Sequence, residues 1–163
     1  MIKKILTCMA ALTLSSTAMA ENWDSRKGLR FGYNYVNGAK EADADVNSPH
    51  MTVLGFELQQ TMEGGEWLDL LFIQNLSIAG LDQSFAAPSL SVLAGFEINN
   101  QLQVGVGPNL SAFDPGGENN YFHLVGAVGY TLTAGKFSVP VHAIYIPDVN
   151  DYWRFAATTG VNW

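Results

Sequence analysis

Eight ionisable side chains occupy alternate positions in segments where apolar and polar residues alternate, so they could form charge networks or act as acids and bases. They are Arg30, Glu57, Asp69, Glu97, His123, Lys136, His142 and Arg154. Buried charges need partners, and Arg30 and Glu57 fall on neighbouring expected strands, where they can form one pair. These eight residues predict a structural polar network, with a polar conduit or proton-linked gate as the functional alternative.

His123 and His142 are the histidines that could serve as general bases. A hydrolase acting on lipid would place His beside Ser and a carboxylate, all facing lipid. The chain has neither a Gly-x-Ser-x-Gly elbow nor a His-x-Ser motif, and both histidines share the face of the charged residues. We therefore expect no catalytic residue and no enzyme, and a lipid A-modifying enzyme remains an alternative.

Metal and cofactor sites are also not expected. The acidic residues of the connecting segments, such as Glu41, Asp43 and Asp45, match no EF-hand spacing. Cys8 is the one cysteine, and Gly105 and Gly107 lie within an expected strand with no helix after it. Solubility alone explains acidic loops, and Ca²⁺ or Mg²⁺ bridging these carboxylates to lipopolysaccharide is the alternative.

Alternation with a period of two predicts eight strands. The expected ranges are 28–37, 50–60, 67–79, 89–98, 101–112, 121–132, 136–147 and 152–163. The connections alternate between longer segments rich in Gly, Pro, Asp and Asn and tighter turns. Asn99 and Asn100 suit a hairpin because Asn tolerates positive φ. This pattern predicts an all-β fold, an eight-stranded antiparallel up-and-down transmembrane β-barrel with both termini periplasmic.

One face of the expected strands is apolar and aromatic, and the other is small or polar and carries the ionisable strand residues, apart from His50, which opens the second strand. In a soluble lipocalin-like ligand binder, the apolar face would line a cavity and the polar face would meet water. The polar face here is small and sparse in charge, which suits a narrow lumen, and the apolar face suits lipid. The membrane arrangement is therefore preferred, with a plugged lumen or a narrow conduit for small or hydrophobic solutes.

The first 20 residues have a basic start at Lys3 and Lys4, a short apolar stretch and an Ala-Met-Ala ending. This pattern predicts a cleaved signal peptide at 1–20, followed by one barrel domain at 21–163. Without that segment the formal charge is 6 − 15 = −9. Nucleic acid is not an expected partner, because phosphate binding needs clustered basic residues.

The last expected strand alternates Trp153, Phe155, Val161 and Trp163 on its apolar face and ends on an aromatic residue. With the signal peptide and the eight strands, this ending resembles the small eight-stranded outer-membrane β-barrel proteins of Gram-negative bacteria. The resemblance implies a place in the outer membrane, contact with lipid and lipopolysaccharide, and recognition of the terminal strand by the barrel-assembly machinery. It matches no specific member, so it implies an envelope-structural or surface-contact role without assigning residues.

Overall fold

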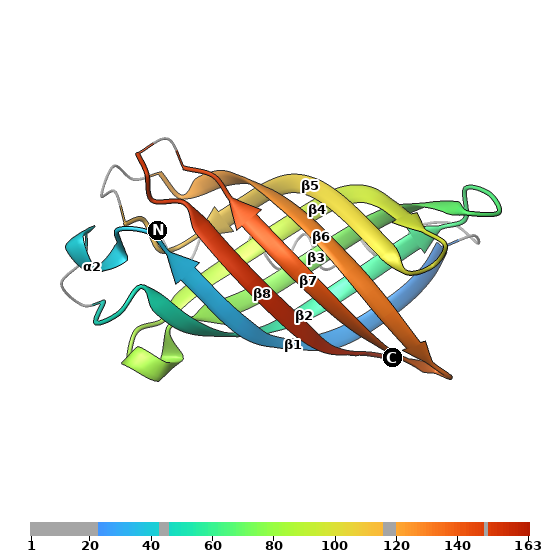
Figure 1. Ribbon diagram of the computed structural model, residues 1–163, viewed down its shortest axis with the longest axis horizontal. Coiled ribbons are helices and arrows are strands. Elements are labelled where there is room, and N and C mark those ends of the chain that lie inside the picture. Colours follow the sequence, from blue (N-terminus) through green and yellow to red (C-terminus); the bar gives the residue numbers. More distant parts are fainter. Residues whose placement is uncertain (1–22, 43–45, 116–119, 149) are drawn as a thin grey trace.

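The computed structural model describes residues 23–42, 46–115, 120–148 and 150–163, and it shows a closed antiparallel β-barrel in which each strand pairs with its sequence neighbours (Figure 1). The strands are β1 (Trp23–Val36), β2 (His50–Met62), β3 (Leu68–Ala79), β4 (Ala87–Ile98), β5 (Leu102–Ser111), β6 (Phe122–Ala134), β7 (Phe137–Ile146) and β8 (Arg154–Asn162). The predicted eight-stranded up-and-down barrel is confirmed. Each strand has at least nine residues, which is enough to cross a bilayer when tilted.

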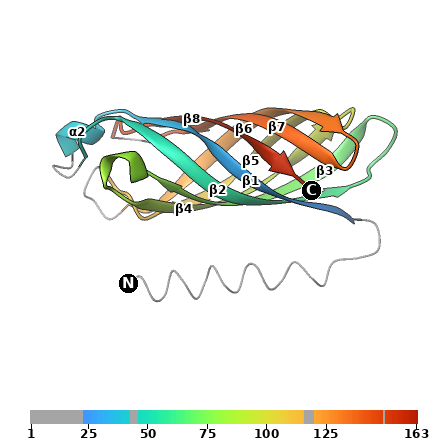
Figure 2. The same ribbon diagram turned by 90° about the horizontal axis from the view of Figure 1, so that it is seen from below.

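The two ends of the barrel differ in their connections. The turn end carries three short links, at residues 63–67, 99–101 and 135–136. The loop end carries four longer links, and these include the short helix α2 (Ala39–Ala42) and the 3-10 turn η2 (Leu81–Gln83). Figure 2 shows α2 at one end of the elongated barrel and the C-terminus toward the other.

Pairing of β1 with β8 closes the barrel. Gly28 lies opposite Asn162, and Val36 lies opposite Arg154. Beyond the end of β8, Lys27 and Trp163 exchange backbone hydrogen bonds of 3.1 and 2.8 Å. The sheet is thus closed on itself, and its side chains must point either inward or outward.

The outward positions are apolar, as the alternation predicts. Large side chains exposed by 40% or more include Leu29, Phe31, Leu54, Phe56, Leu70, Phe96, Val104, Leu124, Val128, Val141, Phe155 and Val161. The inward positions carry the buried polar residues. This orientation is the reverse of a soluble binder with an apolar cavity, so the lipocalin-like alternative is wrong for this chain.

Three boundary expectations need correction. β1 starts at Trp23 rather than at residue 28. The polar residues between Trp23 and Lys27 still pair with β2, and Trp23 lies opposite Met62. Lys136 was expected on the lumen face of a strand, but it is exposed in the turn before Phe137. Trp153 lies just before β8.

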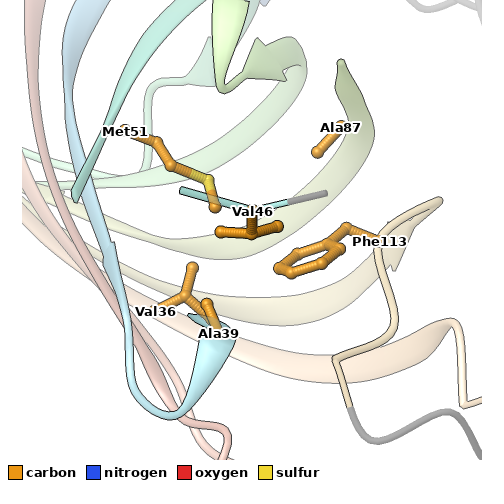
Figure 3. Packing of buried hydrophobic residues seen from close by; sticks show 6 residues of the cluster. All are labelled: Val36, Ala39, Val46, Met51, Ala87 and Phe113. Carbon is orange, nitrogen blue, oxygen red and sulfur yellow. The ribbon is translucent and has the colours of Figure 1, made fainter. Parts of the chain in front are cut away.

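An apolar cap fills the loop end of the barrel (Figure 3). It consists of the buried residues Val36, Ala39, Val46, Met51, Ala87 and Phe113, with Ala79 and Phe85 packed against them. Ala39 and Val46 lie in the first long connection and are buried, so these described parts of the connection face into the barrel. The connection between β3 and β4 is held to β2 by Asp82 Oδ1, which accepts hydrogen bonds from Thr52 N and Oγ1 at 2.9 and 2.8 Å. These bonds lower the pKa of Asp82.

Among the residues that the structure describes, no helix has the length and apolar character needed to cross a membrane. The predicted signal peptide at 1–20 lies outside the described residues.

The turn between β4 and β5 provides a test of backbone geometry. Asn99 and Asn100 have φ of 51° and 57°, and Gln101 N donates to Ile98 O at 3.1 Å, as in a type I′ turn. A left-handed conformation costs most residues about 1–2 kcal/mol. Asn100→Ala should therefore lower the free energy of unfolding by about 1 kcal/mol, whereas Asn100→Gly should leave it unchanged or raised. Urea unfolding in detergent micelles would measure both, and equal effects of Ala and Gly would contradict the turn geometry.

Candidate functional site in the closed lumen

The middle of the lumen is held by an ion pair between β1 and β2. Arg30 Nε donates to Glu57 Oε2 at 3.1 Å, and Arg30 Nη2 contacts Glu57 Oε1. Both side chains are at most 2% exposed. The pair expected from the sequence is therefore present and fully buried, in a bidentate arrangement that suits guanidinium and carboxylate geometry.

Glu57 also connects this pair to the other side of the lumen. Asn75 Nδ2 donates to Glu57 Oε2 at 3.3 Å, and His142 Nδ1 lies 3.8 Å from the same oxygen. His142 Nε2 donates to Gln103 Oε1 at 2.7 Å. Side chains from β1, β2, β3, β5 and β7 thus form one polar layer across the barrel.

Small residues make room for the two large groups of this layer. A Cβ at Gly129 would lie 1.9 Å from Cδ2 of His142, and a Cβ at Gly160 would lie 2.8 Å from Nη1 of Arg30. The imidazole and the guanidinium therefore lie directly over the backbone of a neighbouring strand. The small lumen residues noted in the sequence serve this close packing.

A second polar group occupies the turn end of the lumen. Glu97 Oε2 accepts hydrogen bonds from Gln59 Nε2 at 3.2 Å and Thr61 Oγ1 at 3.4 Å. Asn162 Nδ2 donates to Gln59 Oε1 at 3.4 Å, which joins β8 to β2 across the lumen. Asp69 lies opposite Glu97 in the β3–β4 register, and its Oδ1 accepts from Gly64 N at 3.1 Å.

The third polar group lies beneath the cap and contains Arg154 and His123. Arg154 Nη1 donates to Ser111 Oγ at 2.8 Å, and Nη2 donates to Phe113 O at 2.9 Å. Arg154 Nη2 also lies 3.2 Å from His123 Nε2, and His123 Nδ1 lies 3.4 Å from Asp148 Oδ2. Because a guanidinium can only donate, His123 Nε2 accepts and the imidazole hydrogen is on Nδ1, facing Asp148.

Ser111, His123 and Asp148 share residue types with a hydrolase triad but not its connections. Arg154 lies between the serine and the imidazole, and Ser111 Oγ already donates to Phe113 O at 3.1 Å. The histidine therefore has no serine hydroxyl to deprotonate. His123 is also buried inside the barrel, where it does not face lipid.

Apolar residues also pack inside the lumen, a feature that the charged residues of the sequence did not predict. Leu71, Ile73, Leu93 and Val125 form a buried cluster on β3, β4 and β6. The uncharged partners Gln59 and Gln103 were also absent from the prediction, which rested on charged residues at the inward positions. The signal that could have identified these residues is their place at alternate strand positions, on the same face as the charged residues. Val46 carried no such signal, because a connection has no period.

An internal chamber of about 80 Å³ lies between the cap and the Arg30 layer. Its lining includes Met51 and Phe113 from the cap, and Arg30 and His142 from the polar layer. Within the described part of the chain, no three His, Cys, Asp or Glu side chains come together as a metal site.

The lumen and the outer face together define the class of the protein. An antiparallel barrel that buries paired charges and exposes an apolar band is a transmembrane β-barrel, because lipid is the solvent that accepts such a surface. The chain resembles small outer-membrane barrels in its closed eight-stranded architecture.

Comparison with known proteins gives likenesses of structure only. No protein-family model and no curated protein sequence match the chain. It is similar to the Yersinia pestis outer membrane protein Ail in a phospholipid nanodisc, at 13% identity and TM-score 0.46, over 86% of this chain and 100% of that one. It is also similar to the crystal structure of Ail, the attachment invasion locus protein of Yersinia pestis, at 12% identity and TM-score 0.49, over 85% of this chain and 97% of that one. A de novo designed transmembrane β-barrel is similar at 10% identity and TM-score 0.46, over 85% of this chain and 93% of that one.

Breaking the central ion pair should destabilise the barrel strongly. Arg30→Ala leaves the Glu57 carboxylate buried without its cation, and we expect a loss of about 3–5 kcal/mol in the free energy of unfolding. The double variant Arg30→Met/Glu57→Leu should recover most of this loss. Arg26→Ala, which removes a surface pair with Asp24, is the control and should cost under about 1 kcal/mol. An Arg30→Ala barrel as stable as the Arg26→Ala barrel in urea would refute the assignment.

The contact between Gly129 and His142 gives an independent test of lumen packing. Gly129→Ala should cost about 1–3 kcal/mol, because the added methyl group overlaps the imidazole. Gly126→Ala is the matched control on the same strand, since a Cβ there meets nothing within 4 Å. Equal urea midpoints for the two variants would show that His142 does not pack over Gly129.

Proposed function

We propose that this protein is a non-enzymatic integral outer-membrane β-barrel with a closed lumen, contributing to envelope structure or to contacts at the cell surface. The observation that carries the proposal is the pairing of an apolar outer face with a lumen blocked at three levels. Residues 1–20, with the pattern of a signal peptide, would direct export, and residues 21–163 would form the barrel domain.

The blocked lumen favours a structural role over a conduit. The apolar cap covers the loop end, the Arg30–Glu57 layer spans the middle, and the Gln59–Glu97 group occupies the turn end. A solute would have to displace buried charge pairs, which are costly to separate. A narrow conduit is therefore the alternative that conductance decides.

The unequal ends of the barrel support an orientation. Membrane barrels have short periplasmic turns and longer extracellular loops. The ladder between Lys27 and Trp163 lies at the turn end of this barrel. Both termini would then face the periplasm, and the long connections would face outward, near lipopolysaccharide.

Outer-membrane lipid, lipopolysaccharide and the barrel-assembly machinery are the proposed partners. Phe155, Val161 and Trp163 are exposed on the apolar side of the terminal strand, where the machinery would read them. The geometry around Ser111 and His123 supports the absence of hydrolase activity, because the serine hydroxyl is directed to a carbonyl oxygen. No cofactor is part of the proposal.

The proposal predicts a heat-modifiable outer-membrane protein without stable conductance. On a gel, the unboiled and boiled protein should give different bands, since a closed barrel resists unfolding in detergent, and the protein should fractionate with the outer membrane. In planar bilayers it should show no stable channel current. A single unshifted band in the periplasmic fraction would overturn the membrane assignment.

Conductance would separate the two membrane roles. A stable current that changes in a Glu57→Gln or Arg154→Gln variant would establish the conduit and reject the closed lumen. Lipid A of altered mass after incubation with purified protein, abolished by His123→Ala or His142→Ala, would restore the enzyme.

A further inference from the structure

The chamber beneath the cap contains buried polar atoms without partners in the protein. Arg154 Nε, Asn109 Oδ1 and Thr158 Oγ1 make no hydrogen bond to any residue that the structure describes. All three residues line the chamber and are at most 6% exposed. An unsatisfied buried polar atom is costly, so three in one cavity indicate an occupant that is not part of the chain.

The charge of the chamber indicates the chemistry of that occupant. Its lining carries the guanidiniums of Arg30 and Arg154 but a single carboxylate, Glu57, which is bonded to Arg30. The ion pairs of the described residues do not include Arg154. The carboxylates of Asp148 and Asp114 attract the Arg154 guanidinium from nearby, but neither forms an ion pair with it. A buried cation without a directly paired anion favours a negatively charged ligand.

The volume and remaining walls limit its size. The chamber of about 80 Å³ is roughly half of an engineered cavity of about 150 Å³ that holds benzene, so it accepts about three to five non-hydrogen atoms. Val53, Val125 and Ile144 add apolar wall beside the polar atoms. The occupant therefore combines one anionic group with a very short apolar part.

We propose that the chamber is a binding site for a small monocarboxylate. Arg154 Nε–H and the Thr158 hydroxyl donate to the carboxylate, and the short chain lies against the apolar wall. The amide oxygen of Asn109 accepts from a water bound with the ligand. This site goes beyond the proposed envelope role, since a closed barrel can fulfil that role with an empty or hydrated chamber.

Propionate, with five non-hydrogen atoms, is the probe for this site. The folded full barrel in detergent micelles, labelled with ¹⁵N, is titrated with sodium propionate against sodium chloride at matched ionic strength. The amides of Asn109 and Thr158 should shift and saturate with propionate. Propionamide, which has the same size without the charge, should bind at least about tenfold more weakly.

Two variants make the result specific to the chamber. Arg154→Gln should abolish saturation, whereas Arg26→Gln, which removes the same charge at the turn end, should leave it unchanged. If Arg154→Gln fails the heat-modifiability test, Thr158→Val replaces it, since this substitution preserves shape and removes one donor. It should weaken binding about fivefold.

Three outcomes would overturn the site. One is a shift that stays linear in propionate, which would indicate that water alone fills the chamber. The others are equal affinity for propionamide and unchanged binding in the chamber variant that folds. None of these results bears on whether the barrel resides in the outer membrane, which the gel and fractionation test separately.

Discussion

Closure of β1 against β8 is the constraint on which the rest of the structure depends. In lipid, every backbone N–H and C=O group in the membrane must find a partner within the protein, and a sheet achieves this only without free edges. The register from Gly28 opposite Asn162 to Val36 opposite Arg154 provides that closure. Once the sheet is closed, alternate residues are committed to lipid or to the lumen, and each inward side chain must fit with the others.

Eight strands leave a lumen that side chains must largely fill. The chain fills it with polar layers and an apolar cluster. Arg30 and Glu57 form the centre of one polar layer, and Leu71 and Leu93 belong to the buried apolar cluster. The buried charges then form hydrogen bonds within their own layer, and apolar packing completes the cross-section. For Arg30 and Glu57, this pairing offsets the cost of burial, which would be several kcal/mol for either charge alone.

Much of this architecture was predictable from a period of two. The alternation of apolar and polar residues determines which face meets lipid, and Arg30 and Glu57 form their pair because diagonal neighbours on adjacent strands are close in space. The boundaries were less predictable. Polar residues between Trp23 and Lys27 obscured the start of β1, which extends along β2 beyond the apolar stretch.

The cap and the lumen partners show why the remainder could not be read from the sequence. Val46 is one apolar residue in a polar connection, and its burial depends on how that connection folds across the barrel. Lys136 continues the alternation of β7 in the sequence. It nevertheless lies in the turn with Gly135, and β7 begins only at Phe137. Connections have no periodic constraint, so tertiary packing alone determines where their side chains lie.

The cap also explains why the chamber lies in the loop half of the lumen. Short turns bring strand ends together, and side chains such as Gln59 and Glu97 meet across the lumen there. At the loop end, Phe113 and Met51 pack against the first connection, and their packing closes the barrel above Arg154. The guanidinium is thereby anchored from above by Phe113 O and Ser111 Oγ, and its Nε remains without a protein partner. A barrel closed by a cap at one end and by polar side chains at the other retains a chamber between them, lined by apolar side chains as well as polar ones. The position of that space follows from the loop that closes it rather than from the strands that surround it.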